Sequence, residues 1–303
     1  GSEMLTNPPT YGTLPISSVP AYVAAAPPMS ERVLLLSPRD IDRATLVASS
    51  ALTSLPVTNL QNQEPRKVWR SLSAVSQYVD ITLDSPIACN AIAMSGFNMS
   101  AAGVWRLHGY ASVSDMGVTA AVSSAWQSVW PGGLRHYDPD WGPEVALLRI
   151  ENENPYLHWR IEFSDPSEAT TFLDIGRLAL GRAVQFSINC DIDGGIGFVP
   201  NDVAELNGYG QIFTDPRPYA QRTFDMPWTA LAQDEVSAQA MELSRLRGQA
   251  GDVFCFLDPG GVYNFHLWSM QGLFTGRAQY TPRPLFVGGM MCWSFTFSLI
   301  QKL

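Results

Sequence analysis

The stretch Gln77–Ser100, with the sequence QYVDITLDSPIACNAIAMSGFNMS, decides the fold class. Val79, Ile81 and Leu83 alternate with polar residues, which is typical of a strand that buries one face. After a turn, residues 91–94 form a continuous apolar run, which predicts a more completely buried strand. The stretch therefore predicts two strands joined by a turn.

The same patterns recur along the chain. Residues 104–110 follow a short polar turn, and apolar residues alternate with polar ones over residues 157–163 and again over residues 184–190. Short strands separated by turns, without a helical period between them, are typical of an antiparallel sandwich. We therefore expect a mainly β protein in which residues 31–183 form a β-sandwich.

The second part of the chain carries the one clear helical pattern, over residues 234–247. Asp234 is expected to cap the start of this helix and Gly248 to end it. Its apolar stripe consists of Val236, Ala240, Leu243 and Leu246. Alternation returns in a strand from Trp293 to Leu299. We expect residues 184–303 to form a second β-rich domain with this one α-helix.

Residues 1–30 are rich in proline and almost free of charge, which disfavours both helix and central strand. We expect an extended arm, which is either a floppy tail or a segment that docks on a neighbouring subunit. Residues 1–3, before Met4, are typical of an expression scar, and Met29 is an alternative natural start.

The composition limits the classes of partner. A net charge of −9 is unlike that of a protein that grips nucleic acid through its phosphates, so no nucleic-acid partner is expected. No apolar run is long enough to span a membrane, and the start lacks the pattern of a secretory signal. We therefore expect neither membrane insertion nor secretion.

The four cysteines lie far apart in apolar runs, at Cys89, Cys190, Cys255 and Cys292. Because no CxxC pair exists, neither a zinc site nor thiol exchange is indicated. We expect reduced thiols in the core, as in a protein made in a reducing cytosol, with a disulfide as the alternative.

The sequence contains no motif that specifies a reactive centre. It lacks HExxH, GxSxG and Walker patterns, and its four histidines do not have metal-ligand spacing. The segment 191–197, DIDGGIG, departs from the calcium-loop order, so we expect a turn between strands there, with calcium as the alternative. We expect no enzyme activity, no metal and no cofactor. A glycosidase-type pair of distant carboxylates is the alternative.

The segment Ser124–Val145, SAWQSVWPGGLRHYDPDWGPEV, combines aromatic rings with Gly and Pro. Loops on a sandwich often carry recognition, and an aromatic ring can stack on the C–H face of a sugar. The alternatives are that these rings pack under the loop and pin it to the sheet, or that they contact another subunit.

Three segments of the first part resemble the discoidin-like sandwich modules found in bacteriophage tail proteins. They are LPVTNLQNQEPRKVWRS, YVDITLDSPIACNAIAMSGFNMSAAGVWRLHGYAS and HWRIEFSDPSEATTFLDIGRLALG, and the resemblance covers residues 33–182. It implies a discoidin-like jelly-roll sandwich, of a class that often binds glycans or lipid headgroups through loops at one end. Binding loops vary within the family, so the ligand-binding candidates come from composition. They are Trp69, Arg70, Trp126, Trp130, Arg135, Tyr137, Asp138, Asp140 and Trp141.

The second part resembles phage tail proteins of the distal-tail or tube type. The similar pieces are Arg222–Trp228 (RTFDMPW), the helical segment 234–247, GDVFCFLDP and the terminal WSFTFSLIQ. This resemblance implies assembly into rings.

Together these patterns predict a structural, non-enzymatic component of a phage tail tip or baseplate, located in the virion and made in the bacterial host cytoplasm. The second domain would contact other copies of the chain and other tail or baseplate proteins, and the sandwich loops would contact host-surface glycan. One alternative is a free carbohydrate-binding, lectin-like protein. The other alternative is a polysaccharide hydrolase.

Overall fold

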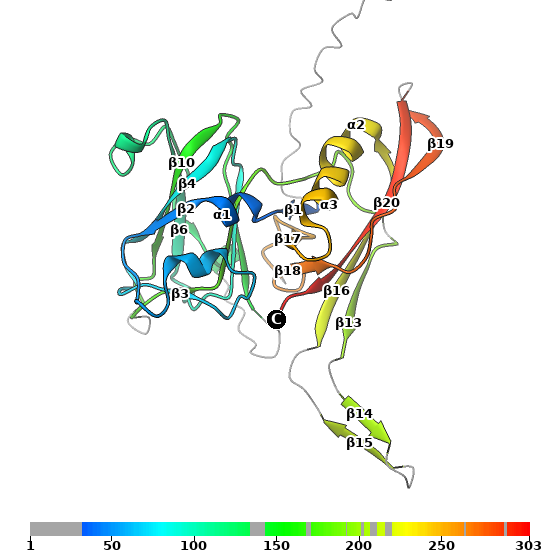
Figure 1. Ribbon diagram of the computed structural model, residues 1–303, viewed down its shortest axis with the longest axis horizontal. Coiled ribbons are helices and arrows are strands. Elements are labelled where there is room, and N and C mark those ends of the chain that lie inside the picture. The colour runs from blue at the N-terminus through cyan, green and yellow to red at the C-terminus, as the bar shows by residue number, and fades with distance from the viewer. Residues whose placement is uncertain are drawn as a thin grey trace, which may run out of the picture.

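The computed structural model is mainly β, as the sequence predicts (Figure 1). A β-sandwich from the first part of the chain lies beside a β-rich second half that carries the main helix. The structure describes residues 32–133, 143–167, 171–191, 193–200, 203–206, 211–215, 220–263, 265–287 and 290–303. The arm predicted at residues 1–30 lies outside the described residues.

The sandwich consists of two main antiparallel sheets. The strands of the first sheet are, in spatial order, β2 (Thr45–Ala48), β4 (Gln77–Ile87), β10 (Tyr156–Ser164), β6 (Val104–Tyr110) and β7 (Val122–Ser123), with β8 (Gln127–Ser128) also paired to β6. The second sheet contains β12 (Arg177–Gly181), β5 (Ala91–Ser95) and β9 (Val145–Arg149), and β11 (Asp174–Ile175) pairs separately with β3 (Trp69–Arg70). The short helix α1 (Arg39–Arg43) and 3-10 turns at Val57–Gln61, Val113–Asp115 and Pro131–Gly133 connect the strands.

The alternating pattern in β4 has the predicted result. Val79, Ile81 and Leu83 are buried in the core between the two sheets. The intervening side chains lie on the outer face of the first sheet, where they remain partly exposed.

Strand β5 is buried on both faces, because the second sheet lies between the sandwich core and the second half. Ile92 and Met94 belong to the sandwich core. Ala91 and Ala93 belong instead to a cluster that includes Phe254 of the second half. Small side chains on this face let the two sheets approach closely. The continuous apolar run at residues 91–94 therefore reflects burial against two layers.

The second half is built on one large antiparallel sheet. Its strands are, in spatial order, β1 (Leu34–Leu36), β17 (Asp252–Phe256), β18 (Ser269–Phe274), β20 (Met290–Gln301), β16 (Gln221–Ala232) and β13 (Gly195–Val199), with β19 (Thr281–Val287) also paired to β20. A separate hairpin of β14 (Val203–Leu206) and β15 (Ile212–Asp215) projects away from the body (Figure 1). Trp228, Phe295 and Phe297 form the aromatic centre of this half's core.

Strand β1, near the start of the described residues, belongs to the sheet of the second half and precedes the sandwich. Leu34 pairs with Phe256 and Leu36 with Phe254 in the register of β1 with β17. Leu35 also exchanges two backbone hydrogen bonds with Val184, of 2.8 and 2.9 Å. The sandwich is thus inserted between β1 and the rest of the second half. The predicted boundary at residues 183 and 184 stays a prediction, although residues 34–36 pair with the later sheet.

The predicted helix is present and runs through α2 (Gln233–Glu235), a π-helical segment (Val236–Ala240) and α3 (Met241–Arg247). Gly248 ends it with a positive φ of 53°, as predicted. The prediction that Asp234 caps the start is wrong, because Ala232 is the N-cap residue and supplies no side-chain hydrogen bond. Asp234 lies instead in the first turn, where its negative charge interacts favourably with the positive end of the helix dipole.

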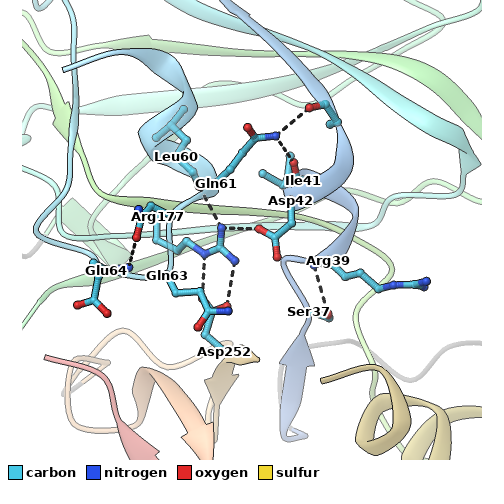
Figure 2. Close-up of polar contacts among 12 residues, drawn as sticks. Ser37, Arg39, Ile41, Asp42, Leu60, Gln61, Gln63, Glu64, Arg177 and Asp252 are labelled. Carbon is cyan, nitrogen blue, oxygen red and sulfur yellow. Dashed lines mark hydrogen bonds and ion pairs between the residues drawn. The ribbon is translucent and has the colours of Figure 1, made fainter. Parts of the chain in front are cut away.

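A cluster of buried charges joins the sandwich to the second half (Figure 2). Arg177 of β12 is fully buried, and its guanidinium donates hydrogen bonds of 2.8 and 2.9 Å to the carboxylate of Asp252 in β17. Its Nη1 forms an ion pair of 2.5 Å with Asp42 of α1. Arg247, at the end of α3, also pairs with Asp252, at 2.7 Å. Asp252 is therefore shared by two guanidinium groups, one from each half of the protein.

The partners of Arg177 explain why its charge is tolerated inside the protein. Burial alone would lower the pKa of Arg177, but its hydrogen bonds with Asp252 and Asp42 outweigh this effect and raise the pKa. Gln271 of β18 donates a further hydrogen bond of 2.8 Å to Asp252. A buried charge is stable only when it is paired and hydrogen-bonded, so removing one member should leave another uncompensated.

All four cysteines are free thiols, as predicted. Cys89, Cys255 and Cys292 are buried, and Cys190 is half-buried. Burial raises the pKa of Cys89 and of Cys255, which keeps both thiols protonated.

None of the helices in the described ranges is long and apolar enough to cross a membrane.

Candidate functional site

Two of the predicted ligand-binding aromatics belong to the core of the sandwich. Trp69 is fully buried and donates its indole N–H to the carbonyl of Ser50 at 3.0 Å. Trp130 is 4% exposed and donates its indole N–H to the carbonyl of Met99 at 3.1 Å. The prediction that these rings contact ligand is wrong, because each ring is enclosed and its polar atom is already satisfied. Trp130 follows the alternative in which a ring pins its loop to the sheet.

Arg70 is also committed to the fold. Its guanidinium makes a bidentate pair with Asp174, with both hydrogen bonds at 2.7 Å, and lies 4.0 Å from the centre of the Phe172 ring. This pair ties β3 to β11. Such geometry leaves little of the guanidinium for a ligand. The other candidates, Arg135, Tyr137, Asp138, Asp140 and Trp141, lie outside the described residues.

Among the candidate aromatic residues that the structure describes, Trp126 lies open to solvent. It lies between β7 and β8, and 43% of its surface is exposed. The guanidinium of Arg106 lies over its ring, 4.5 Å from the ring centre. A cation stacked on one part of an indole orients the ring and still leaves apolar surface exposed. Trp126 is therefore held as a partly open platform.

Strand register brings polar groups beside this ring. Arg106 of β6 lies opposite Glu162 of β10, and its Nε donates a hydrogen bond of 2.7 Å to the Glu162 carboxylate. His108 lies 3.6 Å from the same carboxylate through Nε2, and its Nδ1 lies 2.7 Å from the hydroxyl of Ser123 in β7. We call Trp126, Arg106, Glu162, His108 and Ser123 the Trp126 platform.

The surroundings of His108 in the Trp126 platform favour the neutral form of its imidazole ring. Burial of the imidazole lowers the pKa of His108, although the nearby Glu162 carboxylate partly opposes the shift. Near neutral pH the imidazole is therefore uncharged, with one ring nitrogen as donor and the other as acceptor. The platform combines an apolar ring face, a carboxylate acceptor and a guanidinium donor.

The neighbouring part of the same sheet face is closed. Arg160 of β10 makes a bidentate pair with Asp80 of β4, at 2.6 and 2.9 Å, and covers the ring of Tyr78. The loop at Gly117 lies directly on this guanidinium, because a Cβ at Gly117 would be 2.4 Å from Nη1 of Arg160. The part of the outer face near Trp126 remains partly open.

Reasoning from the sequence did not find Arg106, Glu162 or Ser123. The alternation of residues 157–163 placed Glu162 on the polar face, but its proximity to Trp126 depends on the pairing of β6 with β10. That pairing joins residues far apart in the chain, and no local pattern encodes it. The signal that could have helped is the row of charged residues at alternate positions in two strands.

A turn directly precedes β13, but the strand expected over residues 184–190 is not present. Val184 makes only an isolated bridge with Leu35, so this turn does not join two strands. The amide of Gly194 donates a hydrogen bond of 3.1 Å to the carbonyl of Asp191, and β13 begins at the next residue. Within the described part of the chain, no group of three or more His, Cys, Asp or Glu side chains is placed to hold a metal ion.

No protein-family model and no curated protein sequence matches the chain. Among solved structures, it is similar to a galactose complex of a family 32 carbohydrate-binding module from C. perfringens NanJ (14% identity, 48% of this chain, 98% of that chain, TM-score 0.35). It is also similar to a family 32 module from a family 31 glycoside hydrolase of Clostridium perfringens (12% identity, 47% and 94% covered, TM-score 0.36). The lectin domain of lectinolysin with Lewis B antigen is similar too (10% identity, 47% and 96% covered, TM-score 0.33). At these values the likeness carries no argument about function, and none of the three is a phage tail protein.

Proposed function

We propose that this protein recognises carbohydrate without altering it chemically, and that the Trp126 platform is the contact surface. The observation that carries the proposal is the half-open Trp126 ring, fixed by Arg106 and bordered by Glu162. Sugars present an apolar C–H face and a rim of hydroxyl groups. An exposed ring with adjacent donors and acceptors matches both features.

The position of the Trp126 platform supports the proposal. Arg106 and Glu162 lie on paired central strands of the first sheet, so the backbone holds them at a fixed separation. A preorganised surface of this kind loses little conformational entropy when a ligand binds. Their charges pair with each other, so the surface as a whole suits a neutral or weakly charged sugar.

We expect Trp126→Ala to weaken glycan binding at least about tenfold, because the stacked ring supplies apolar contact that no other group replaces. Trp126→Phe should retain part of the affinity. The measurement is titration calorimetry after a screen of immobilised glycans, including galactose, Lewis B antigen and chitosan oligomers, the ligands named for similar solved structures.

The matched control is Tyr263→Ala, which removes a ring that is 78% exposed in the second half. It should leave glycan binding unchanged. Equal losses in the two variants, or no binding to any glycan by the wild-type chain, would overturn the proposal. Release of soluble sugar from a polysaccharide incubated with the protein would instead support the hydrolase alternative.

We propose as a second function that the second half holds the protein in a larger assembly. The observation that favours it is the outer edge of the large sheet, where β13 exposes Phe198 (54%) and Val199 (41%). The β14–β15 hairpin lies beyond the ends of β13 and β16 (Figure 1). Open edges and exposed apolar side chains are surfaces that another chain can cover. The sequence resemblance gives the specific form of this proposal, a subunit of a phage tail tip or baseplate in the virion.

Sedimentation velocity tests the assembly. The wild-type chain should show an average mass that rises with concentration, and Phe198→Lys should reduce this rise because it places a charge on the apolar edge. Tyr263→Lys is the control, since it changes an exposed ring away from this edge and should associate like the wild type. A chain that stays monomeric at every concentration would contradict the proposal.

A further inference from the structure

A groove lies on the face of the second half that is turned away from its core. It is a hollow of about 460 Å³ formed by β16, β19 and β20 together with the segment before β19. β19 and the first part of β20 lie on the side of the second half that is distant from the sandwich (Figure 1). The lining residues that carry the argument are Thr229, Arg277, Thr281, Arg283, Ser294 and Thr296.

The groove exists because β20 is longer than its partners on one side. β18 pairs with β20 only at residues 299–301, and β19 pairs with it only at residues 290–294. Between these two pairings the edge of β20 has no strand partner in the described part of the sheet, and the chain crosses the gap through residues 275–280. Thr275 anchors this crossing with a backbone hydrogen bond of 3.0 Å to Ser298.

The floor of the groove is rich in hydroxyl groups. Ser294, Thr296 and Ser298 alternate along β20 with Phe295 and Phe297, which are buried in the core on the opposite face. Thr281 of β19 lies directly opposite Ser294 in the strand register. A row of hydroxyls on a strand is suited to hydrogen bonding with a polyhydroxylated ligand.

Two arginines give the groove its charge. Arg277 and Arg283 are exposed, and neither forms an ion pair with any residue that the structure describes. Arg283 donates a hydrogen bond of 3.0 Å from Nε to the hydroxyl of Ser294, which directs its guanidinium along the floor. On the sandwich, by contrast, Arg106 and Arg160 are both paired with carboxylates. Unpaired guanidinium groups in a protein of net charge −9 mark a local site for oxyanions.

A second hollow extends the groove toward the end of α3. It has a volume of about 350 Å³ and shares Arg277, Thr296 and Ser298 with the first. Arg245 lines this extension, but its charge is paired with Glu242 at 2.6 Å. The acidic residue Asp225 lies on the same sheet face, opposite Ser298 in the register. The positive part of the groove is therefore the part around Arg277 and Arg283.

We propose that this groove binds an acidic saccharide, with the two guanidinium groups on its oxyanions and the hydroxyl row on its sugar hydroxyls. The site is separate from the Trp126 platform and lies on the other half of the protein. The ligand oxyanion is either a carboxylate or a sulfate ester, since both accept bidentate hydrogen bonds from arginine.

Titration calorimetry of the full chain at low salt tests the proposal with three tetrasaccharides. They are a sulfated fragment of heparin, an oligogalacturonate and neutral maltotetraose. One or both acidic sugars should bind, and maltotetraose should not bind. Binding of the heparin fragment would indicate recognition of a sulfate ester, and binding of the oligogalacturonate would indicate recognition of a carboxylate. The double change Arg277→Gln and Arg283→Gln should weaken binding about tenfold, since each exposed charged contact contributes a few-fold. Added salt should weaken wild-type binding more than variant binding.

Two controls separate this site from general charge effects and from simple anion binding. Arg43→Gln with Arg182→Gln changes the net charge equally at exposed positions of the sandwich and should leave binding unchanged. Thr296→Val should lower the affinity for the saccharide a few-fold and leave the affinity for inorganic sulfate unaltered. The proposal fails if neither acidic sugar binds, if the control pair weakens binding as much as the groove pair, or if inorganic sulfate binds as tightly as the saccharide. Trp126→Ala should not affect binding of the acidic saccharide. A negative result for the groove can therefore be distinguished from a negative result for glycan binding at the Trp126 platform.

Discussion

The change Asp252→Asn is expected to lower the free energy of unfolding by about 3–5 kcal/mol, the typical loss when one member of a buried ion pair is removed. Asp252 is fully buried and compensates Arg177 and Arg247 together. Without its charge, two guanidinium groups at the junction share only the carboxylate of Asp42. Urea unfolding followed by tryptophan fluorescence measures the loss.

Two companion variants make this prediction specific. Arg177→Gln should lower the free energy of unfolding less than Asp252→Asn does, because Asp252 then keeps Arg247 as its partner. Glu242→Gln breaks an exposed pair with Arg245 and should change stability little. If Asp252→Asn is no more destabilising than Glu242→Gln, the junction cluster does not hold the halves together as described.

The change Gly176→Ala should destabilise the sandwich by about 3 kcal/mol or more, or prevent folding, because backbone atoms occupy the space that a side chain would need. A Cβ at Gly176 would be 1.9 Å from the carbonyl oxygen of Pro65 and 2.7 Å from its carbon. Gly96 meets the same carbonyl, at 2.6 Å, and has a positive φ of 65°. The loop at Pro65 thus fits between two glycines, and no rotamer change can relieve the clash.

Gly195→Ala is the matched control for this substitution. Gly195 lies in β13, and a Cβ there would meet no atom within 4 Å. Its effect on stability should stay within about 0.5 kcal/mol. Thermal unfolding monitored by circular dichroism compares the two variants, and a Gly176→Ala protein that melts at the wild-type temperature would refute the packing argument.

Local patterns predicted strands β4, β5, β6, β10 and β20, because alternation is imposed by the geometry of each strand alone. The alternating residues 184–190 are an exception, since they form no strand. The core positions Val79, Ile81 and Leu83, and the helix end at Gly248, follow from residues close together in the sequence. The placement of β1 beside β17 could not be predicted, because these strands are more than two hundred residues apart and three apolar leucines fit any buried strand.

The candidate site was less accessible to sequence reasoning for the same physical reason. Composition identified Trp126, Trp69 and Trp130 alike, but exposure depends on what the rest of the chain places around each ring. Trp69 is enclosed by the core of the sandwich, whereas Trp126 lies beneath the Arg106 guanidinium and is 43% exposed. The groove of the second half was missed because its hydroxyls were read as the outward residues of a regular strand.

The insertion of the sandwich between β1 and β13 has a consequence for how the protein would be oriented in use. A domain on a single linker can rotate freely. The two connections of the sandwich to the second half are instead hydrogen-bonded to each other through Leu35 and Val184, and the sandwich packs on an apolar contact around Phe254. The orientation of the sandwich is therefore fixed relative to the second half. Wherever the second half is anchored, the Trp126 ring would point in one direction, and several anchored copies would present their rings in a common alignment.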